Sequence, residues 1–199
     1  MRYPSGHKAK TRARILAAAA RRFRERGFEG AGVDDVMHSA GLTPGGFYAH
    51  FDSKEALLAE TLAAGPGHPG KRLVADLDGL DGVSLLLEVV RRYLSRSHRD
   101  DPGGGCALPT LAADVAREGP QARRAFEDYL LGFVRRLESR TPPGPGLAPA
   151  DRVLATAALF AGGIMLARAV KDGALSDRIL RACRRLAVPE AGASEEPRP

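Results

Sequence analysis

The sequence contains only two cysteines, Cys106 and Cys183, in 199 residues. Two thiols cannot build a disulfide framework or a structural zinc site, so a reducing compartment is favoured. The N-terminus is polar and basic with no apolar segment after it, which predicts that there is no signal peptide. The longest apolar run, residues 153–167, is interrupted by Thr156 and is shorter than the ~20 residues of a membrane span. These absences predict a soluble protein of the cytoplasm.

Motifs of the common enzyme classes are also lacking. The sequence contains no P-loop, nucleophile elbow, dinucleotide-binding fingerprint or metal-ligand spacing. Its five histidines, at positions 7, 38, 50, 68 and 98, are scattered, and none lies beside a pair of carboxylates in a useful register. We therefore expect a protein that is not an enzyme and that needs neither a metal nor a cofactor.

Acidic residues are nearly absent from the first 26 positions. Nine Lys or Arg lie there with one acid, Glu25, which gives this segment a net charge of +8. Because the whole chain carries +6, the other 173 residues sum to −2. A basic excess confined to one end is typical of a segment that binds a polyanion. The alternative is a basic helix that is solvated and has no partner.

Residues 33–51 have the pattern of two short helices joined by a tight turn. The first helix has an apolar face of residues three and four positions apart, namely Val33, Val36, Met37 and Ala40. Gly41 suits the left-handed conformation that lets a chain leave a helix sharply. Thr43 is placed to cap the second helix with its hydroxyl, and Pro44 fits its first turn. Phe47 and Phe51 give that helix a buried stripe. Such a pair is typical of the helix-turn-helix, whose second helix enters the DNA major groove.

A basic helix precedes this pair and another helix follows it. Residues 8–26 carry a stripe of apolar residues spaced by four, namely Ile15, Ala19 and Phe23. Gly27 is expected to end this helix, and Ser53 is a suitable N-cap for a helix that runs to about residue 63. Residues 64–70 are rich in Gly and Pro and cannot continue a helix. They predict the boundary of an N-terminal domain of residues 1–63.

Several motif segments in this order resemble the N-terminal domain of TetR-type (TetR/AcrR) transcriptional regulators. They are Gly27-Phe28-Glu29, Val33-Asp34-Asp35-Val36, Ala40-Gly41-Leu42-Thr43, Gly46-Phe47-Tyr48-Ala49-His50-Phe51 and Ser53-Lys54-Glu55-Ala56-Leu57. The resemblance extends over roughly residues 10–62. It implies a helix-turn-helix DNA-binding domain followed by a helical domain that binds a ligand and forms a dimer.

The resemblance implies that Tyr48, His50 and Lys54 position the protein on double-stranded DNA by contacting phosphates. Lys54 follows Ser53 in a first helical turn, where backbone N–H groups also point outward. Thr43 can combine its cap with a phosphate contact. The alternatives are a half-buried aromatic role for Tyr48 and a packed or capping role for His50.

The start of the second helix, Pro44-Gly45-Gly46, has no side-chain donor or acceptor for reading bases. Bidentate hydrogen bonds from Arg, Asn or Gln, worth about 1–3 kcal/mol per base pair, are therefore missing from these positions. We expect sparse direct readout by Thr43, by Tyr48, by contact of Ala49 with a thymine methyl, and by close backbone approach at the glycines. Basic residues between positions 2 and 14, Arg12 among them, would add minor-groove contacts.

Beyond residue 70 the chain is helical wherever it is periodic, which predicts an all-α fold. One expected stripe consists of Val83, Leu86, Leu87, Val90 and Leu94, and another of Ala122, Phe126, Leu130, Phe133 and Leu137. Further helices are expected over about 108–117, 150–171 and 176–187, with breaks at Gly119-Pro120 and in the Pro-rich loop 142–149. This segment, residues 71–187, would form the ligand-binding and dimerisation domain. Residues 188–199 would form a mobile tail.

The helix expected over 150–171 is apolar or small on every side between Arg152 and Arg168, apart from Thr156. A surface helix would show one polar face, so this helix needs covering on both sides. Gly162-Gly163 would cost about 1 kcal/mol per glycine unless it allows close helix contact. With residues 176–187 it predicts a four-helix bundle between the two subunits of a homodimer, which the resemblance also implies. The alternative is a central helix in a monomeric core.

The resemblance further implies a small, often apolar effector bound between the helices of the second domain. Candidate lining residues, each of which also fits a plain core position, are Leu86, Leu111, Phe126, Tyr129, Phe133, Phe160 and Met165. Cys106 follows three glycines and precedes a helix, so its thiol could be activated to sense oxidants or electrophiles. A buried, inert thiol is the simpler interpretation.

These patterns predict a ligand-responsive DNA-binding transcriptional regulator. It would be a repressor that binds a palindromic operator as a homodimer and is released by a small molecule, with a thiol sensor that uses Cys106 as the alternative. Two hypotheses from other classes remain open, an enzyme and a helical interaction protein whose DNA reader is vestigial.

Overall fold

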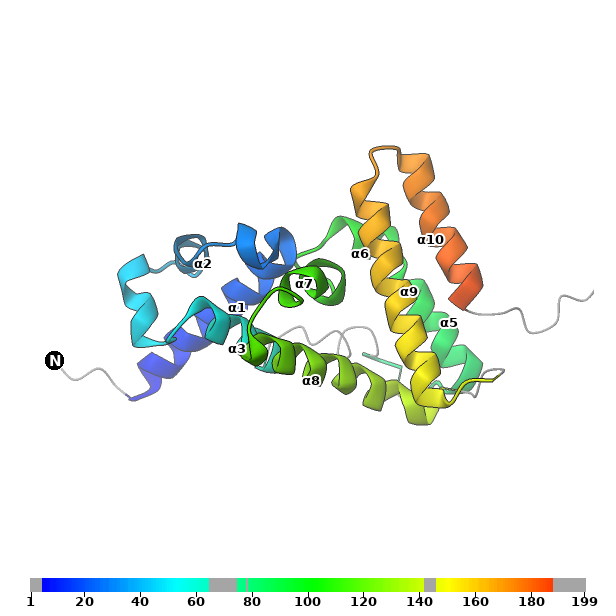
Figure 1. The fold of residues 1–199 in the computed structure, drawn as a ribbon, viewed down its shortest axis with the longest axis horizontal. Helices are drawn as coiled ribbons and strands as arrows, with labels where there is room; N and C mark the ends of the chain where they lie inside the picture. Colours follow the sequence, from blue (N-terminus) through cyan, green and yellow to red (C-terminus); the bar gives the residue numbers. More distant parts are fainter. Residues whose placement is uncertain (1–4, 65–74, 78, 142–145, 188–199) are drawn as a thin grey trace, which may run out of the picture. The chain divides into compact units, whose positions relative to one another are not determined.

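The computed structural model describes residues 5–64, 75–77, 79–141 and 146–187. Every element within these ranges is a helix (Figure 1), so the predicted all-α class is confirmed. The elements are α1 (Ser5–Gly30), α2 (Val33–Ser39), η1 (Pro44–Ala49), α3 (Lys54–Ala64), α5 (Gly82–Tyr93), α6 (Arg96–Asp100), α7 (Leu108–Val115), α8 (Pro120–Leu137), η2 (Glu138–Arg140), α9 (Pro149–Ala169) and α10 (Gly173–Ala187). Sequence reasoning missed the short helix α6.

The chain forms two compact units. The first, here the N-terminal unit, comprises residues 1–75 and 101–136, and the second, the C-terminal unit, comprises residues 76–100 and 137–199. The predicted domain boundary at residues 64–70 is a different division, because α7 and most of α8 belong with the N-terminal helices. Most of that predicted linker, from residue 65 on, and the predicted tail lie outside the described residues.

Helix α1 is the centre of the N-terminal unit and packs against α2, α3 and α7. The predicted stripe of Ile15, Ala19 and Phe23 is fully buried. Gly27 has a positive φ of 77°, so the regular helix ends where the sequence predicts, although a further helical stretch continues to Gly30. A Cβ at Gly27 would lie 2.7 Å from Asp114 Oδ2. Glycine is therefore required there by backbone conformation and by space.

Polar contacts fasten α7 and α8 to the helices around α1. Asp114 Oδ2 accepts the Phe28 N–H at 2.7 Å. The Arg24 side chain, which is 9% exposed, donates from Nε to the Gly103 carbonyl at 2.7 Å. Glu55 on α3 accepts the N–H of Ala122 in the first turn of α8 at 3.4 Å, where a carboxylate also complements the helix dipole. Residues 101–136 therefore fold as part of the unit that carries α1–α3.

The turn between α2 and η1 follows the sequence prediction in its backbone. Val36, Met37 and Ala40 are buried, and Gly41 takes a left-handed φ of 67°. The second helix differs, because η1 is a 3₁₀ helix and the Thr43 hydroxyl makes no capping hydrogen bond. The Thr43 carbonyl accepts the Gly46 N–H instead, at 3.2 Å. The predicted hydroxyl cap is therefore wrong, and the Thr43 side chain is exposed.

Two buried rings lie in and just after η1, and a serine caps the start of α3. Phe47 and Phe51 are both buried, with ring centroids 5.8 Å apart in a stacked arrangement. Ser53 Oγ accepts the Ala56 N–H at 3.0 Å, which confirms the predicted N-cap. Helix η1 itself packs against α2.

In the C-terminal unit the buried face of α5 differs from the prediction. The residues in contact with the core are Leu85, Leu86, Val89, Val90 and Tyr93. Val83 and Leu87, which were expected in the stripe, are 45% and 51% exposed. Tyr93 explains the difference, because its ring stacks on Phe160 of α9 with centroids 4.6 Å apart. Sequence reasoning left this tyrosine out of the stripe.

Helices α9 and α10 pack closely at Gly163. A Cβ on Gly163 would lie 2.9 Å from Cys183 Sγ and 3.1 Å from Leu94 Cδ2, whereas a Cβ on Gly162 would meet nothing within 4 Å. The expected close helix contact is thus made by the second glycine, with residues of the same chain. Ser176 of α10 adds a hydrogen bond from its Oγ to the Ala167 carbonyl at 2.7 Å.

The buried face of α8 also departs from the expected stripe. Ala122, Phe133 and Leu137 are buried as predicted, while Phe126 is only partly buried. Tyr129 takes a buried position that the predicted stripe did not include. Its hydroxyl accepts the Ala107 N–H at 3.2 Å, so a polar contact with the loop before α7 favours this rotation of the helix.

Candidate nucleic-acid interface

The surface formed by residues 43–50, here the η1 surface, carries most of the predicted DNA contacts. Tyr48 is 74% exposed and packs edge-on against Phe47, with ring centroids 5.1 Å apart. Thr43, Gly45 and Ala49 are also exposed. The structure therefore presents Tyr48 to solvent and does not give it the half-buried role considered from the sequence.

The glycines of the η1 surface are not there to relieve crowding. A Cβ on Gly45 would meet no atom within 4 Å, and a Cβ on Gly46 would lie 3.7 Å from Met37 Cε, an ordinary contact. Neither residue has a positive φ. The fold would accept a side chain at position 45, so the bare backbone there is a property of the surface and not a requirement of packing.

Two of the predicted cationic contacts have partners within the protein. Arg12 Nη2 lies 2.6 Å from Glu60 Oε1, and the Arg12 guanidinium lies 4.5 Å from the centroid of the Phe51 ring. The Lys54 ammonium lies 4.2 Å from the centroid of the Phe28 ring. Both members of the Arg12–Glu60 pair are more than a third exposed, so the pair contributes less than about 1 kcal/mol. It can be exchanged for a phosphate at little cost.

His50 lies in a basic environment at the end of η1. Its Nδ1 is buried and has no hydrogen-bond partner among the described residues. Burial lowers the pKa of His50 below its ordinary 6.5, and the positive charges of Lys8 and Arg12 lower it further. The imidazole is therefore mainly neutral near pH 7. A phosphate placed beside these three groups would have the opposite effect, because it favours the protonated ring.

We predict that DNA binding becomes tighter as the pH falls through the range in which His50 titrates. The pKa of His50 is lowered in the free protein and would be raised beside a phosphate, so binding takes up a proton between the two values. Affinity for duplex DNA should change by up to about tenfold per pH unit in that window. Fluorescence anisotropy of a labelled duplex between pH 5.5 and 8 measures this, at about constant ionic strength.

The control for this prediction is His50→Gln, which keeps a donor and cannot titrate. Its pH dependence should be flatter than that of the wild type across the window. An identical slope in the two proteins would show that another group takes up the proton.

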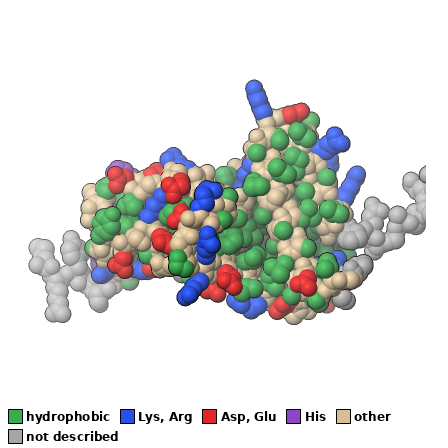
Figure 2. Space-filling model, in the orientation of Figure 1, with side chains coloured by type: hydrophobic (Ala, Val, Ile, Leu, Met, Phe, Trp, Pro, Cys, Tyr) green, Lys and Arg blue, Asp and Glu red, His purple; other side chains and the backbone are tan. Residues whose placement is uncertain are grey.

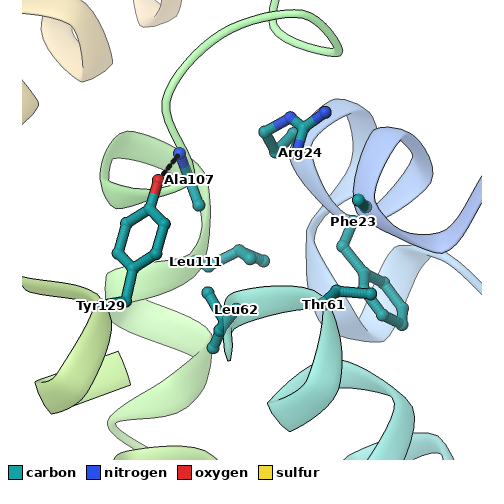
Figure 3. A pocket seen from close by; sticks show the side chains of 8 residues that line it. Phe23, Arg24, Thr61, Leu62, Ala107, Leu111 and Tyr129 are labelled. Carbon is teal, nitrogen blue, oxygen red and sulfur yellow. Dashed lines mark hydrogen bonds between the residues drawn. The ribbon is translucent and has the colours of Figure 1, made fainter. Parts of the chain in front are cut away.

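A small cavity lies inside the N-terminal unit, beside Tyr129 (Figure 3). Its volume is about 10 Å³, room for about one water molecule. The lining residues are Ala20, Phe23, Arg24, Thr61, Leu62, Ala107, Leu111 and Tyr129. Of the predicted effector-lining residues, Leu111 and Tyr129 meet here. A cavity of this size holds no effector unless its side chains move.

The other predicted lining residues have varied surroundings. Phe126 and Phe133 belong to the N-terminal unit, Phe133 being buried, and Leu86 and Phe160 are buried in the C-terminal unit. Met165 is 49% exposed on α9. Met165 lies on an outer face because the inner face of α9 is occupied by Phe160 and Ile164.

Cys106 is buried, with 2% of its surface exposed. Its Sγ accepts the Leu108 N–H at 3.4 Å and lies 3.7 Å from Tyr129 Oη. Burial raises the pKa of the Tyr129 hydroxyl well above its usual value, and the neighbouring Cys106 raises it further. The Leu108 N–H directed at the sulfur fits the predicted helix-start position, while the burial fits the simpler prediction of an inert thiol.

Metal ligands do not gather anywhere in the described ranges, where no group of three or more His, Cys, Asp and Glu could hold an ion. Helix α9, at 21 residues and a mean hydropathy of 1.5 over its most apolar window, is long and apolar enough to cross a membrane by length and composition alone. A third of that window is buried within the structure.

A short helix, a left-handed glycine turn and an exposed second helix beside a basic α1 define a helix-turn-helix protein. Residues 15–61 match the family model described as "Bacterial regulatory proteins, tetR family". This N-terminal segment is therefore similar to that family, as the sequence motifs predict.

Curated relatives and solved structures show further similarities. An uncharacterized HTH-type transcriptional regulator of Bacillus subtilis, YdgC, is 46% identical over 52 residues, which cover 26% of this chain and 27% of YdgC. The regulator UidR of Escherichia coli K12 is 34% identical over 80 residues, 40% of this chain and 41% of UidR. The match thus spans less than half the length of these two relatives.

Structural similarity extends over most of the chain. The reduced form of NemR from Escherichia coli has a TM-score of 0.71 at 22% identity, covering 89% of this chain and 95% of that one. A regulator from Saccharomonospora viridis in complex with choline has a TM-score of 0.63 at 19% identity, covering 89% and 95%. At these identities the likeness shows that the all-helical fold is shared.

Proposed function

We propose that this protein is a DNA-binding transcriptional regulator, a repressor that binds a palindromic operator as a homodimer. The observation that carries the proposal is the exposed η1 surface, held by Phe47 and Phe51 beside the basic α1. The curated relatives are HTH-type transcriptional regulators, which supports the same class. A regulator of this class acts in the cytoplasm, where the chromosome lies, and no enzymatic step is needed for its action.

The η1 surface would bind DNA mainly through phosphates. Tyr48 and His50 can donate to phosphate oxygens, and Lys54 and Arg12 supply charge once they exchange their internal partners. Direct reading of bases would be left to Thr43, to Tyr48, to Ala49 and to the backbone at Pro44, Gly45 and Gly46. We therefore propose that sequence preference comes largely from DNA shape and from few base contacts.

The homodimer would form through the outer faces of α9 and α10. Apolar side chains that lie exposed on these two helices are Leu154 (37%), Met165 (49%), Leu166 (53%), Leu175 (43%) and Leu186 (72%). Figure 2 shows hydrophobic side chains gathered along α9 on the face toward the viewer. A monomeric protein rarely leaves so many apolar side chains of neighbouring helices in water. A second copy of the same face would cover it with two-fold symmetry.

Selection of bound duplexes from a random pool tests this function directly. The expected product is an inverted repeat with fixed half-site spacing, because two identical readers are held at one separation. Affinity for it should fall with salt with a log–log slope of about −0.9 per neutralised phosphate. A pool that yields no enriched sequence, together with no binding to any duplex at low salt, would favour a helical interaction protein with a vestigial reader.

We further propose that a small molecule controls DNA binding. The support is the solved structure from Saccharomonospora viridis, a regulator of the same fold whose complex contains choline. The ligand must bind the DNA-competent and incompetent states unequally to have an effect. Leu111 and Tyr129 already flank a cavity inside the N-terminal unit, which could enlarge by side-chain movement to accept an apolar group.

A second candidate mechanism is oxidant sensing through Cys106. The Leu108 N–H directed at Sγ would stabilise a thiolate, and the structural neighbour NemR was solved in a reduced form. Peroxide would take two electrons from the thiolate to give a sulfenate and water, adding a polar oxygen beside Tyr129.

We predict that Cys106→Ser removes any loss of operator binding that mild peroxide causes, while the half-buried Cys183 changed to Ser does not. Because Cys106 is 2% exposed, oxidation should be slow, over minutes rather than seconds. The measurement is operator affinity before and after peroxide, for the wild type and for each variant. Equal responses of wild type and Cys106→Ser would end the thiol hypothesis and leave ligand control.

A further inference from the structure

Four arginines surround a hollow of about 410 Å³ in the C-terminal unit. The hollow lies between α10 and the segment that joins the end of α5 to α6, elements that Figure 1 shows in green and orange. Its lining residues, here the arginine groove, are Arg91, Ser95, Arg96, Ser97, Asp177, Leu180, Arg181 and Arg184. The volume is within the range of about 300–1,000 Å³ that small-molecule sites occupy.

Positive charge exceeds negative charge in this groove. Three carboxylates pair with four guanidinium groups at its edges. Glu88 pairs with Arg91 at 2.6 Å and with Arg92 at 2.7 Å, Asp177 pairs with Arg96 and with Arg99, and Asp100 pairs with Arg99 at 2.7 Å. The hydrogen bonds from Arg91 and Arg92 lower the pKa of Glu88 to about 2, so this carboxylate stays ionised at any ordinary pH.

Arg181 and Arg184 are the other two arginines that line the groove. Neither has a carboxylate partner among the described residues, although both line the groove. They are three positions apart on α10, so their side chains lie on one face of the helix. Guanidinium groups hold phosphate oxygens with paired N–H donors better than an ammonium does. These two guanidinium groups make the groove suited to a doubly charged oxyanion.

Neutral donors add to this set. Ser95 and Ser97 both line the groove, and their Oγ atoms lie 2.9 Å apart. Ser95 Oγ also donates to the Arg92 carbonyl at 2.9 Å, so Ser97 is the hydroxyl that donates within the pair. The Ser97 side chain is exposed and can rotate to a bound oxygen atom. Serine hydroxyls beside arginines are a frequent combination in phosphate recognition.

The arginine groove is separate from the face proposed for the dimer. At 3.6 residues per turn, Arg181 and Arg184 project from the side of α10 roughly opposite to Leu175 and Leu186. Leu180, buried between these two sides, faces the core of its own unit. A second subunit that covers the apolar face would leave the groove open to solvent.

We propose that the arginine groove binds a small molecule that carries a phosphate group. Arg181 and Arg184 hold the phosphate from α10, while Arg96 and Ser97 approach it from the other wall. The space beyond one phosphate accommodates a body of about the size of a sugar. This site is independent of the η1 surface, so it stands or falls separately from the proposed DNA binding.

Isothermal titration calorimetry on the full chain tests the proposal with inorganic phosphate and glucose 6-phosphate as probes, and with glucose as the uncharged counterpart. Ionic strength is held constant with sodium chloride, since screening would otherwise mimic a specific effect. Both phosphates should bind and glucose should not. Arg181→Gln with Arg184→Gln should weaken glucose 6-phosphate binding at least about tenfold.

The matched control is Arg178→Gln with Arg185→Gln. These arginines are on the same helix and outside the groove, and their replacement changes the net charge by the same amount. The control should stay within about twofold of the wild type. If the groove variant fails to fold, Arg184→Lys is measured in its place. It keeps the charge, lacks the paired N–H donors of the guanidinium group, and should weaken binding about threefold or more. Absence of heat with glucose 6-phosphate at about 10 mM, or equal weakening by both double variants, overturns the proposal.

Discussion

Replacing Leu166 and Leu186 together by Glu should give a folded monomer that binds its operator about a hundredfold more weakly than the wild type. The two leucines are 53% and 72% exposed on α9 and α10, so the subunit does not need them for its own core. In the proposed dimer they lie in the covered face, where four unpaired carboxylates would be buried. Losing the dimer removes the second DNA-binding unit. Two linked binding units typically gain about 10²–10⁴ in affinity over one alone.

The matched control is Val83→Glu with Leu87→Glu on α5. These side chains are 45% and 51% exposed, and the change in charge is the same. Sedimentation gives the mass of each variant, and anisotropy gives its operator affinity. The control should remain a dimer with wild-type binding. If the α9–α10 variant also remains a dimer, the interface lies elsewhere. If the α9–α10 variant is monomeric but binds as tightly as the wild type, one DNA-binding unit is enough for operator binding.

Gly163→Val should destabilise the protein by about 2–4 kcal/mol, whereas Gly162→Val should cost about 1 kcal/mol or less. Both changes place the same β-branched residue on the same helix, so their helix-propensity terms cancel in the comparison. A Cβ at position 163 would lie 2.9 Å from Cys183 Sγ and 3.1 Å from Leu94 Cδ2, and at position 162 it has open space. The difference therefore measures how closely α9 packs in its own unit.

Urea unfolding followed by circular dichroism gives the two free energies, with far-UV spectra to check that both variants fold. Equal losses at the two positions would mean that the close packing of α9 against α10 and α5 is not the source of the effect. A loss at position 162 that appears only with falling protein concentration would instead place Gly162 at the subunit interface.

The sequence predicted features that depend on neighbours close along the chain. The spacing of Ile15, Ala19 and Phe23, the left-handed turn at Gly41 and the Ser53 cap each follow from residues within one or two turns, and all three are present. Local periodicity also sufficed for the all-α class. The rotation of α5 was predicted wrongly because Tyr93, which stacks on Phe160, was not recognised as a core residue.

The candidate site shows where such reasoning stops. Arg12 was expected at DNA from its charge and position, and its pairing with Glu60, 48 residues away, has no local signal. The same holds for the cation–π contact of Lys54 with Phe28. The arginine groove was missed for the same reason, since Arg91 and Arg184 are almost a hundred residues apart and meet only after α5 and α10 pack.

The empty space beside Gly45 has a consequence for how the proposed DNA-binding surface can diverge. Since a Cβ there meets no other atom, mutations to Ser, Asp or Arg, each one nucleotide away from a glycine codon, would reach the exposed η1 surface without a penalty in folding. Each would introduce a new hydrogen-bonding group on the surface that we propose faces the bases. After a gene duplication, one copy could thus acquire a different set of target promoters in a single step while both copies remain equally stable.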